Sequence, residues 1–291
     1  MDESKISQER REVLQKIQEY EKNGWFDKQI ENDPEAPELL PDQVDYLCKK
    51  ASSRFKRKVA NFVADRYFLG LIKKDVIVID GICGEEYLEE GLKNGAMVTC
   101  NHFSPFDNYI VFHAIRKYLP KKYLYKIIRE GNYTNFPGLY GFFFRYCNTL
   151  PLSRNRRTMM NFMSAVNTLL KDGESILLYP EQEMWWNYRK PRPFKIGGFK
   201  MAYKAGVPVL PVFISMQDDG SRLDENGYPV QRHTVHVLPP IYPNMELGEK
   251  AGSQDLLDRA QAAYREAYEA AYSKPLTYTC DILAGADKNE E

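Results

Sequence analysis

Seven short apolar runs lie between residues 75 and 238 and constrain the fold most strongly. Each run is continuous rather than alternating between polar and apolar residues, which is typical of strands covered on both faces. Stretches with helical spacing separate or follow these runs, so the sequence predicts an α/β fold with a mixed, largely parallel sheet flanked by helices. The expected strands are 75–79, 96–100, 123–128, 148–152, 175–179, 207–214 and 233–238, and the expected helices are 105–118, 155–171, 197–205 and 253–273.

The first 74 residues differ from the rest and predict an N-terminal helical extension. Apolar residues at helical spacing occupy 5–22 and stop at Asn23-Gly24, a common way to end a helix. A Pro-rich acidic linker is expected at 31–42, and a second helix within 42–74. We therefore divide the chain into a helical region (1–74), a main domain (75–275) and a C-terminal tail (276–291), which we expect to be disordered and which begins after Lys274-Pro275.

The second helix of this extension has two contrasting faces. One carries an apolar stripe, and the other is basic. The stripe consists of Phe55, Val59, Phe62, Val63 and Tyr67, and the basic face of Arg54, Lys56, Arg57, Lys58 and Arg66. Basic side chains beside apolar ones suit an anionic membrane surface, where each cation contributes about 1 kcal/mol.

Bulk composition narrows the class of partner and the compartment. Forty Lys and Arg balance forty Asp and Glu, so no overall field favours nucleic acid. Five cysteines are scattered without a CxxC pair, which indicates free thiols in a reducing compartment and no metal site. The charged first residues lack the apolar core of a secretion signal, and no apolar run is long enough to span a bilayer. We expect a cytoplasmic protein that associates peripherally with the membrane.

The segment CNHFSPFDNYIVFHA (100–114) carries the clearest chemical signal. His102 and Asp107 are separated by a turn between a strand and a helix, so their side chains can meet. A carboxylate bonded to one imidazole nitrogen leaves the other free to take a proton from a hydroxyl. No GxSxG nucleophile elbow is present, so the substrate itself would supply the attacking hydroxyl.

The same residues also fit a purely structural interpretation. Ser104, Pro105 and Asp107 match a capping box, with Ser104 as the N-cap and Asp107 three positions later. On that interpretation Asp107 only starts a helix and His102 is a loop residue. If instead the pair is catalytic, the first N–H groups of this helix would stabilise the oxyanion.

Four blocks in this order resemble the lysophosphatidic-acid and glycerol-3-phosphate acyltransferase superfamily. Asn101-His102-x-Ser104-x-x-Asp107 resembles its N-H-x4-D block. Its second block is similar to Asn148–Arg154, its third to Leu178–Glu181 with 193–199, and its fourth to Ala205–Val212. Together the blocks extend over about residues 95–215.

The resemblance implies an acyltransferase without a cofactor. The donor would be acyl-CoA or an acyl carrier protein, and the acceptor a hydroxyl of a glycerol phosphate or lysophospholipid. His102 and Asp107 would be catalytic, and Arg154 would bind the acceptor's phosphate. The other substrate-binding candidates are Asn101, Ser104, Glu181 and Lys195, the last because Gly197 and Gly198 precede a helix that can present N–H groups to an anion.

The third block departs from the family pattern P-E-G-T-R. Here Pro180-Glu181 is followed by Gln182-Glu183-Met184, so the Gly, Thr and Arg are all replaced. Trp185 and Trp186 come next and would either pack or contact the substrate. Loss of a phosphate-binding arginine suggests a different acceptor, uncharged or glycosylated.

Several alternatives stay open at this stage. An altered third block also fits a membrane-associated lipid-binding protein with a decayed site, and a soluble esterase or thioesterase is a further alternative. The aromatic segment 138–146 fits a buried core, an acyl-chain tunnel or a membrane-dipping loop.

Overall fold

A computed structural model describes residues 7–30 and 35–282 of the 291-residue chain. Seven strands form one sheet in the order β1-β7-β6-β2-β5-β3-β4. Neighbouring strands are parallel except for β6 and β7, which are antiparallel. The mixed, largely parallel sheet is therefore confirmed. The strands are β1 (Val78–Cys83), β2 (Met97–Cys100), β3 (Leu124–Ile128), β4 (Thr149–Pro151), β5 (Ser175–Leu178), β6 (Val209–Leu223) and β7 (Pro229–Val237).

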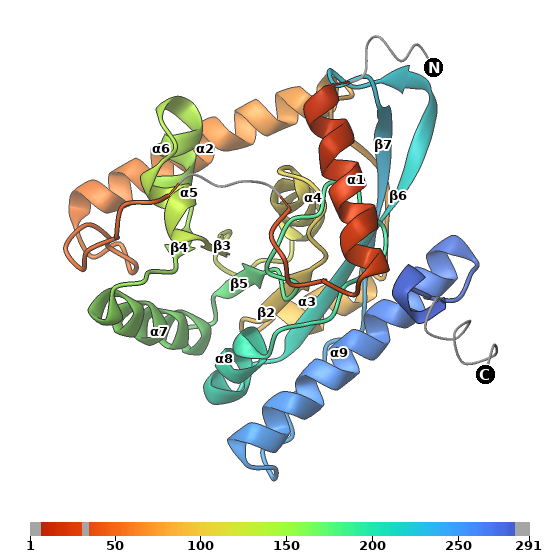
Figure 1. The fold of residues 1–291 in the computed structure, drawn as a ribbon. Coiled ribbons are helices and arrows are strands. Elements are labelled where there is room, and N and C mark those ends of the chain that lie inside the picture. The colour runs from red at the N-terminus through yellow and green to blue at the C-terminus, as the bar shows by residue number, and fades with distance from the viewer. Residues whose placement is uncertain (1–6, 31–34, 283–291) are drawn as a thin grey trace.

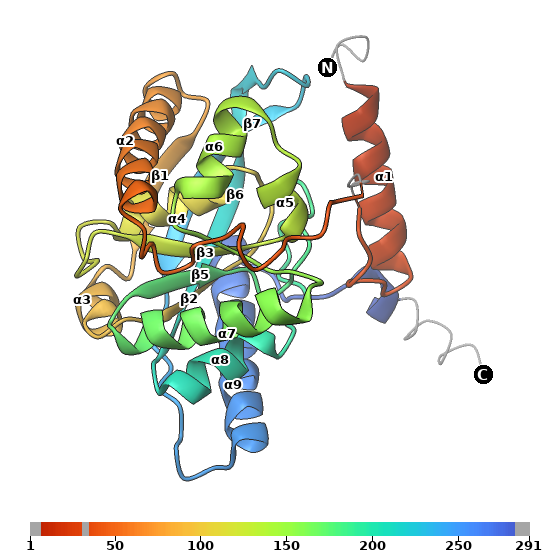
Figure 2. The same ribbon diagram turned by 90° about the vertical axis from the view of Figure 1, so that its left-hand side faces the viewer.

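Helices cover both faces of the sheet (Figures 1 and 2). One hydrophobic cluster joins one face to α7, α8 and α9, and a second joins the other face to α2, α3, α4 and α6. Covering on both faces explains why the strands are continuously apolar. The helices are α1 (Gln8–Lys22), α2 (Ala51–Lys73), α3 (Glu86–Leu92), α4 (Asp107–Ile115), α5 (Glu130–Thr134), α6 (Gly138–Tyr146), α7 (Arg156–Lys171), α8 (Gly197–Ala205) and α9 (Glu249–Tyr272).

Strand β1 begins three residues later than expected, at Val78. Residues 74–77 instead end helix α2, since the N–H groups of Val76 and Ile77 both donate to the carbonyl of Leu71. Three short helices, α3, α5 and α6, were not predicted, because such short segments carry little periodic signal. The aromatic segment 138–146 proves to be helix α6, with Phe143 buried and Leu139 44% exposed.

Helix α2 turns a face with two alanines to the core. Its buried residues are Ala60, Ala64 and Phe68, whereas Phe55 and Phe62 are 68% and 62% exposed. Residues spaced four apart lie on one side of a helix, and small alanines on that side let α2 approach the domain closely. Phe55 and Phe62 of the apolar stripe are therefore left at the surface.

Helix α1 confirms the predicted N-terminal helix and lies apart from both layers (Figure 2). Its buried residues Val13 and Ile17 pack with Ile30, Trp185 and Trp186 in a third hydrophobic cluster. The acidic end of the expected tail, and part of the expected linker, fall outside the described residues. No helix in the described part of the chain is long and apolar enough to cross a membrane.

Candidate active site

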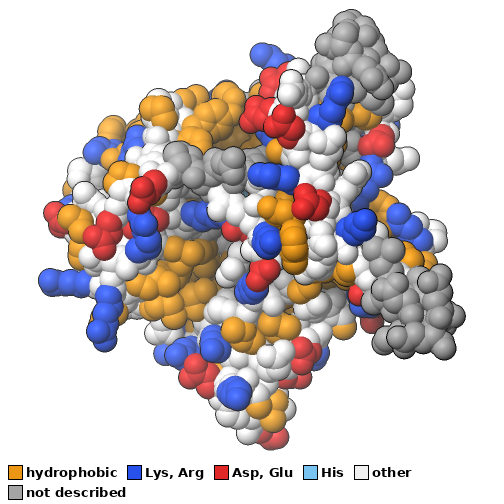
Figure 3. Space-filling view, viewed as in Figure 1, with side chains coloured by type: hydrophobic (Ala, Val, Ile, Leu, Met, Phe, Trp, Pro, Cys, Tyr) orange, Lys and Arg blue, Asp and Glu red, His pale blue; other side chains and the backbone are white. Residues whose placement is uncertain are grey.

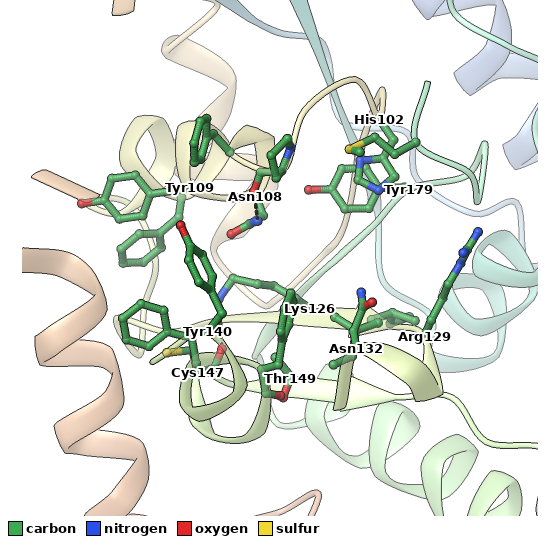
Figure 4. A pocket seen from close by; sticks show the side chains of 18 of the residues that line it. His102, Asn108, Tyr109, Lys126, Arg129, Asn132, Tyr140, Cys147, Thr149 and Tyr179 are labelled. Atoms are coloured by element: carbon green, nitrogen blue, oxygen red, sulfur yellow. Dashed lines mark hydrogen bonds between the residues drawn. The ribbon is translucent and has the colours of Figure 1, made fainter. Parts of the chain in front are cut away.

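A cavity of about 560 Å³ opens beside the carboxyl ends of β2, β3 and β5 (Figure 4). His102, in the loop after β2, and Tyr179, directly after β5, line it together. Because these strands are parallel, their carboxyl ends meet at one edge of the sheet, which is where α/β proteins commonly bind ligands.

His102 and Asp107 form the hydrogen-bonded pair that their spacing predicts. His102 Nδ1 lies 2.7 Å from Asp107 Oδ2. Because a carboxylate accepts, Nδ1 carries the proton and Nε2 is left as the basic nitrogen. Asp107 is buried, with 1% of its surface exposed, so the pair is shielded from water on the carboxylate side.

Asp107 is also part of a capped turn, so the two interpretations of this segment hold together. Its Oδ2 accepts the N–H groups of Phe103 at 3.2 Å and Ser104 at 3.3 Å. Ser104 Oγ accepts the N–H of Phe106 at 3.2 Å. The N–H groups of Phe103, Ser104 and Phe106 are therefore engaged within the turn. An oxyanion role for the first N–H groups of the helix stays a prediction.

Tyr179 contacts both His102 and Asp107, and the sequence did not indicate this third residue. Its hydroxyl donates to Asp107 Oδ1 at 2.5 Å, and its ring stacks on the His102 imidazole with centroids 3.9 Å apart and an interplanar angle of 15°. Burial, together with the Asp107 charge, raises the pKa of the Tyr179 phenol. The phenol thus stays a neutral donor that holds both members of the pair in place.

Replacing Tyr179 with Phe keeps the stacked ring and removes only the donor to Asp107. We expect kcat to fall about ten- to a hundredfold, the size of a lost hydrogen bond to a charged group. Steady-state kinetics of the variant beside wild type check this. An unchanged kcat would leave Tyr179 with a packing role alone.

A buried ion pair supports the backbone of His102 from behind. Glu181 Oε2 accepts Arg192 Nε at 3.2 Å and Arg192 Nη2 at 3.0 Å, and both side chains are at most 2% exposed. The same carboxylate oxygen accepts the N–H of His102 at 3.4 Å. Glu181 does not line the cavity, so the structure gives it a supporting role rather than the substrate contact that we expected.

The rebuilt third block binds helix α1 to the domain. Trp185 is fully buried and stacks on Phe26, and Trp186 is 7% exposed against the same cluster. The N–H of Trp185 donates to the carbonyl of His102 at 3.1 Å. The tryptophans therefore pack and do not reach substrate, which settles the alternative left open by the sequence.

The acidic residue of this block does not leave the cavity negative. Glu183 forms an ion pair with Arg129, and both line the cavity. Glu183 therefore does not by itself disfavour a phosphate here, because the positive charge of Arg129 balances it.

Arg154 lies outside the cavity, and its partners are structural. Its Nε contacts Glu130 at 3.2 Å and its Nη2 donates to the carbonyl of Ala36 at 2.5 Å. Glu130 also accepts the N–H of Leu39 at 2.7 Å. The second block thus holds the chain that precedes α2, and the phosphate contact expected of Arg154 has no support in this geometry.

The remaining substrate-binding candidates are placed elsewhere as well. The Asn101 amide exchanges two hydrogen bonds with the backbone of Ile214, and Ser104 serves the turn described above. Lys195 is an exposed residue 3.4 Å from Asp27. Gly198 lies where a Cβ would collide with Leu178, so that glycine permits close packing of α8 on β5. None of these residues lines the cavity.

Two cations that the sequence did not mark as substrate ligands line the cavity: Lys126 on β3 and Arg129 just after it. Lys126 Nζ donates to the carbonyl of Cys147 at 3.0 Å, which leaves two N–H groups for a ligand. Burial lowers the pKa of Lys126. A single lysine within the apolar run YLYKII was the available signal.

The rest of the cavity is a polar floor facing an aromatic wall. Asn132 and Thr149 accompany Lys126 on the floor, and α2, α4 and α6 supply the wall. The wall residues are Phe68, Phe106, Tyr109, Phe112, Tyr140, Phe143 and Phe144. The described residues contain no group of His, Cys, Asp or Glu side chains suited to a metal ion.

Comparisons with known proteins agree with this geometry. Residues 82–215 match the acyltransferase family model. The fold is similar to the crystal structure of the 1-acyl-sn-glycerophosphate (LPA) acyltransferase PlsC from Thermotoga maritima, with a TM-score of 0.52 and 18% identity. That likeness covers 80% of this chain and 87% of the other. No curated protein sequence matches the chain.

The match includes His102, Asp107 and Tyr179, which meet at the cavity. Residues 82–215, which carry this polar cluster, therefore resemble the acyltransferase family, and the fold of the chain is similar to that of a solved acyltransferase.

Proposed function

We propose that the protein transfers a fatty acyl group from an acyl thioester, acyl-CoA or an acyl carrier protein, to a hydroxyl of a lysophospholipid or glycerol phosphate. The observation that carries the proposal is the His102–Asp107 pair, 2.7 Å apart at the edge of a cavity with an aromatic wall. The wall suits an acyl chain, and the pair suits deprotonation of a hydroxyl.

The reaction needs no acyl-enzyme. His102 takes the proton of the acceptor hydroxyl, whose oxygen attacks the thioester carbonyl. The new C–O bond forms, the C–S bond breaks, and the proton leaves with the thiolate. Asp107 stabilises the imidazolium that forms in between. Asn108 lines the cavity, and its Nδ2 donates one hydrogen to the carbonyl of Pro105 at 3.1 Å, which leaves the second hydrogen for the oxyanion.

The acceptor's phosphate lies on the polar floor against Lys126 and Arg129. These two cations take the part that the family pattern gives to the missing third-block arginine. Lys126 is the stronger candidate, because Arg129 already neutralises Glu183. The substitution at Met184 is on this account compensated from strand β3, and a phosphate-bearing acceptor is retained.

Replacing Lys126 with Met should raise KM for a phosphate-bearing acceptor about ten- to a hundredfold, since a charge-assisted hydrogen bond is lost. An acceptor without phosphate should be much less affected. Burial lowers the pKa of Lys126. As the pH rises, its ammonium group therefore loses its proton before the pH reaches about 10.4, where an ordinary lysine titrates. The KM of the wild type should therefore rise with pH in that range, and the Lys126→Met protein should lose this dependence.

Arg154→Gln is the matched comparison, because it also removes one cation, here one that lies in the second resembling block. Steady-state kinetics should show a KM within about threefold of wild type, since Arg154 lies outside the cavity. A strong KM effect of Arg154→Gln with none of Lys126→Met would reverse the assignment.

The exposed face of α2 suits peripheral contact with a membrane that holds the lipid acceptor. Phe55 and Phe62 are exposed there among Arg54 and Lys58, and hydrophobic side chains gather at the surface over α2 (Figure 3). Tyr140, which lines the cavity, is 42% exposed on the adjacent α6. The cavity and this surface are therefore continuous.

Phe55→Ser/Phe62→Ser should weaken binding to anionic vesicles at every salt concentration, because the apolar insertion is lost. Arg54→Glu/Lys58→Glu should weaken it mainly at low salt, because the Debye length is near 8 Å at physiological ionic strength. Co-sedimentation across a salt series separates the two contributions. Binding that neither double variant changes would show that α2 does not meet the membrane.

Product analysis tests the proposed reaction. The purified protein is incubated with acyl-CoA and, separately, lysophosphatidate, glycerol 3-phosphate, an uncharged monoacylglycerol or a glycosylated acceptor. Mass spectrometry should find the acylated phosphate-bearing product in excess. A preference for the uncharged or glycosylated acceptors would support the different acceptor that the third block suggests and contradict the role given to Lys126.

A further inference from the structure

A second cavity, of about 200 Å³, lies at the start of α2 between this helix, α6 and strands β3 and β4. It is predominantly polar, in contrast to the aromatic wall of the active site. Thr149, on the polar floor of the active-site cavity, lines both cavities. Nothing in the acyl-transfer mechanism uses the residues that line the smaller cavity.

The lining carries more cations than carboxylates. Its cations are Lys50, Lys56, Arg57 and Arg145, and its carboxylates are Asp42 and Asp45. The Asp45 carboxylate accepts the N–H groups of Lys49 and Lys50 at 2.9 Å each, so it is committed to the start of α2. The balance leaves positive charge for a ligand.

Tyrosine hydroxyls add hydrogen-bond donors. Tyr125, which is 3% exposed, accepts Arg57 Nη1 at 2.9 Å, and Tyr146 accepts Lys56 Nζ at 3.3 Å. A hydroxyl that accepts from a cation has its own hydrogen left to donate. Both phenols line the cavity and are thus donors as well as partners of its cations.

Two buried polar atoms of the lining have no partner: Arg57 Nε, a donor, and Asn148 Oδ1, an acceptor. Asn148 is 5% exposed, and its Nδ2 donates to Asn61 at 2.9 Å, which fixes the amide with its oxygen unpaired. A buried polar atom without a partner is destabilising, so a ligand that pairs both atoms would recover the lost stability.

We propose that this cavity is an anion site for a phosphate ester that bears a free hydroxyl. The cations and the phenol and guanidinium donors bind the phosphate oxygens, and Asn148 Oδ1 accepts the ligand's hydroxyl. A volume of about 200 Å³ is roughly that of seven waters at about 30 Å³ each, which admits a phosphoglycerol group. The site is independent of the proposed acyl acceptor.

Calorimetric titration with glycerol 3-phosphate, inorganic phosphate and glycerol tests the site. The titrated protein carries Lys126→Gln, so that the buried ammonium of the active-site cavity is absent. Glycerol 3-phosphate should bind at one site and more tightly than inorganic phosphate, and glycerol should not bind. Absence of saturable binding by both phosphates would overturn the proposal.

Lys56 and Lys58 provide a matched pair of variants, both exposed on α2, of which only Lys56 lines the cavity. Lys56→Gln should weaken glycerol 3-phosphate binding at least fivefold, and Tyr146→Phe should also weaken it. Lys58→Gln should change it less than twofold. Equal effects of the two lysine variants would reduce the site to general surface charge and overturn the proposal.

The same phosphate chemistry occurs in a soluble ester and in a lipid headgroup. Vesicles of phosphatidylglycerol and of phosphatidylcholine separate these sources. If the headgroup is the ligand, glycerol 3-phosphate should compete with phosphatidylglycerol vesicles for wild type but not for Lys56→Gln. If the soluble ester is the ligand, calorimetric binding persists and vesicle binding is indifferent to the competitor.

Discussion

Acyl transfer by the His102→Ala protein is expected to fall by at least the ~10²–10⁴-fold that a positioned proton acceptor contributes. The imidazole lies in a loop and is partly exposed at the cavity, so its removal takes little from the core. The melting temperature of the His102→Ala protein should stay within about 2 °C of wild type, since little packing is lost. Activity and thermal unfolding measured on the same preparation check both halves.

Asp107→Asn is the informative companion to that variant. Asp107 serves the imidazole, two backbone N–H groups and the Tyr179 hydroxyl, so we expect loss of activity together with a lower melting temperature. The contrast with His102→Ala separates chemistry from capping. Full activity of Asp107→Asn with lowered stability would leave only the capping role.

The largest effect on stability is expected from Trp185→Ala. Trp185 is fully buried between α1 and the active-site loop, and truncating a buried large aromatic typically destabilises a protein by about 3–5 kcal/mol. Urea unfolding should show a loss of this size. Activity should fall as well, because loss of the packed indole loosens the segment whose backbone N–H, at residue 185, donates to the carbonyl of His102.

Trp25 is the matched control, since it is a tryptophan of the same region that is 37% exposed. Trp25→Ala should destabilise by less than about 1.5 kcal/mol, in keeping with its exposure. A Trp185→Ala protein as stable as Trp25→Ala would mean that α1 is not docked through the rebuilt third block.

The layered fold was predictable because each continuous apolar run indicates, from its own residues alone, a strand that is covered on both faces of the sheet. Four expected strands agree with β2, β3, β4 and β5 within one residue at each end. Strand β6 continues nine residues beyond its expected end, and β7 begins four residues before its expected start. Strand β1 is displaced because residues 74–77 terminate α2. Which face of α2 is buried was not predictable. Phe55 and Phe62 are more apolar than Ala60 and Ala64, but the small alanine side chains are the ones that face the core.

The candidate site was likewise predictable only in part. His102 and Asp107 were accessible to the sequence because five residues across one turn bring them together. Tyr179, Lys126 and Arg192 act through contacts with residues far away in the chain, and a single sequence does not report such contacts. Arg154 illustrates the converse, because matching a block did not reveal that Glu130 and Ala36 occupy its guanidinium.

The described geometry also bears on the rival functions. The His102–Asp107 pair is intact, and Asp107 accepts three further hydrogen bonds that hold it in place. Such a pair is unexpected in a binding protein with a decayed site. Ser104, the serine beside the pair, has its Oγ engaged with the N–H of Phe106, which does not favour an esterase serine. Both arguments support transfer to an external hydroxyl.

The most direct test of the account is thiol release from acyl-CoA by the purified protein, measured with and without lysophosphatidate. The account predicts release at background without the acceptor, and release matched mole for mole by acylated product when it is present. Equal release without the acceptor would identify a hydrolase, and no release in either case would identify a binding protein. Either result would contradict the central claim that His102 activates the acceptor's hydroxyl.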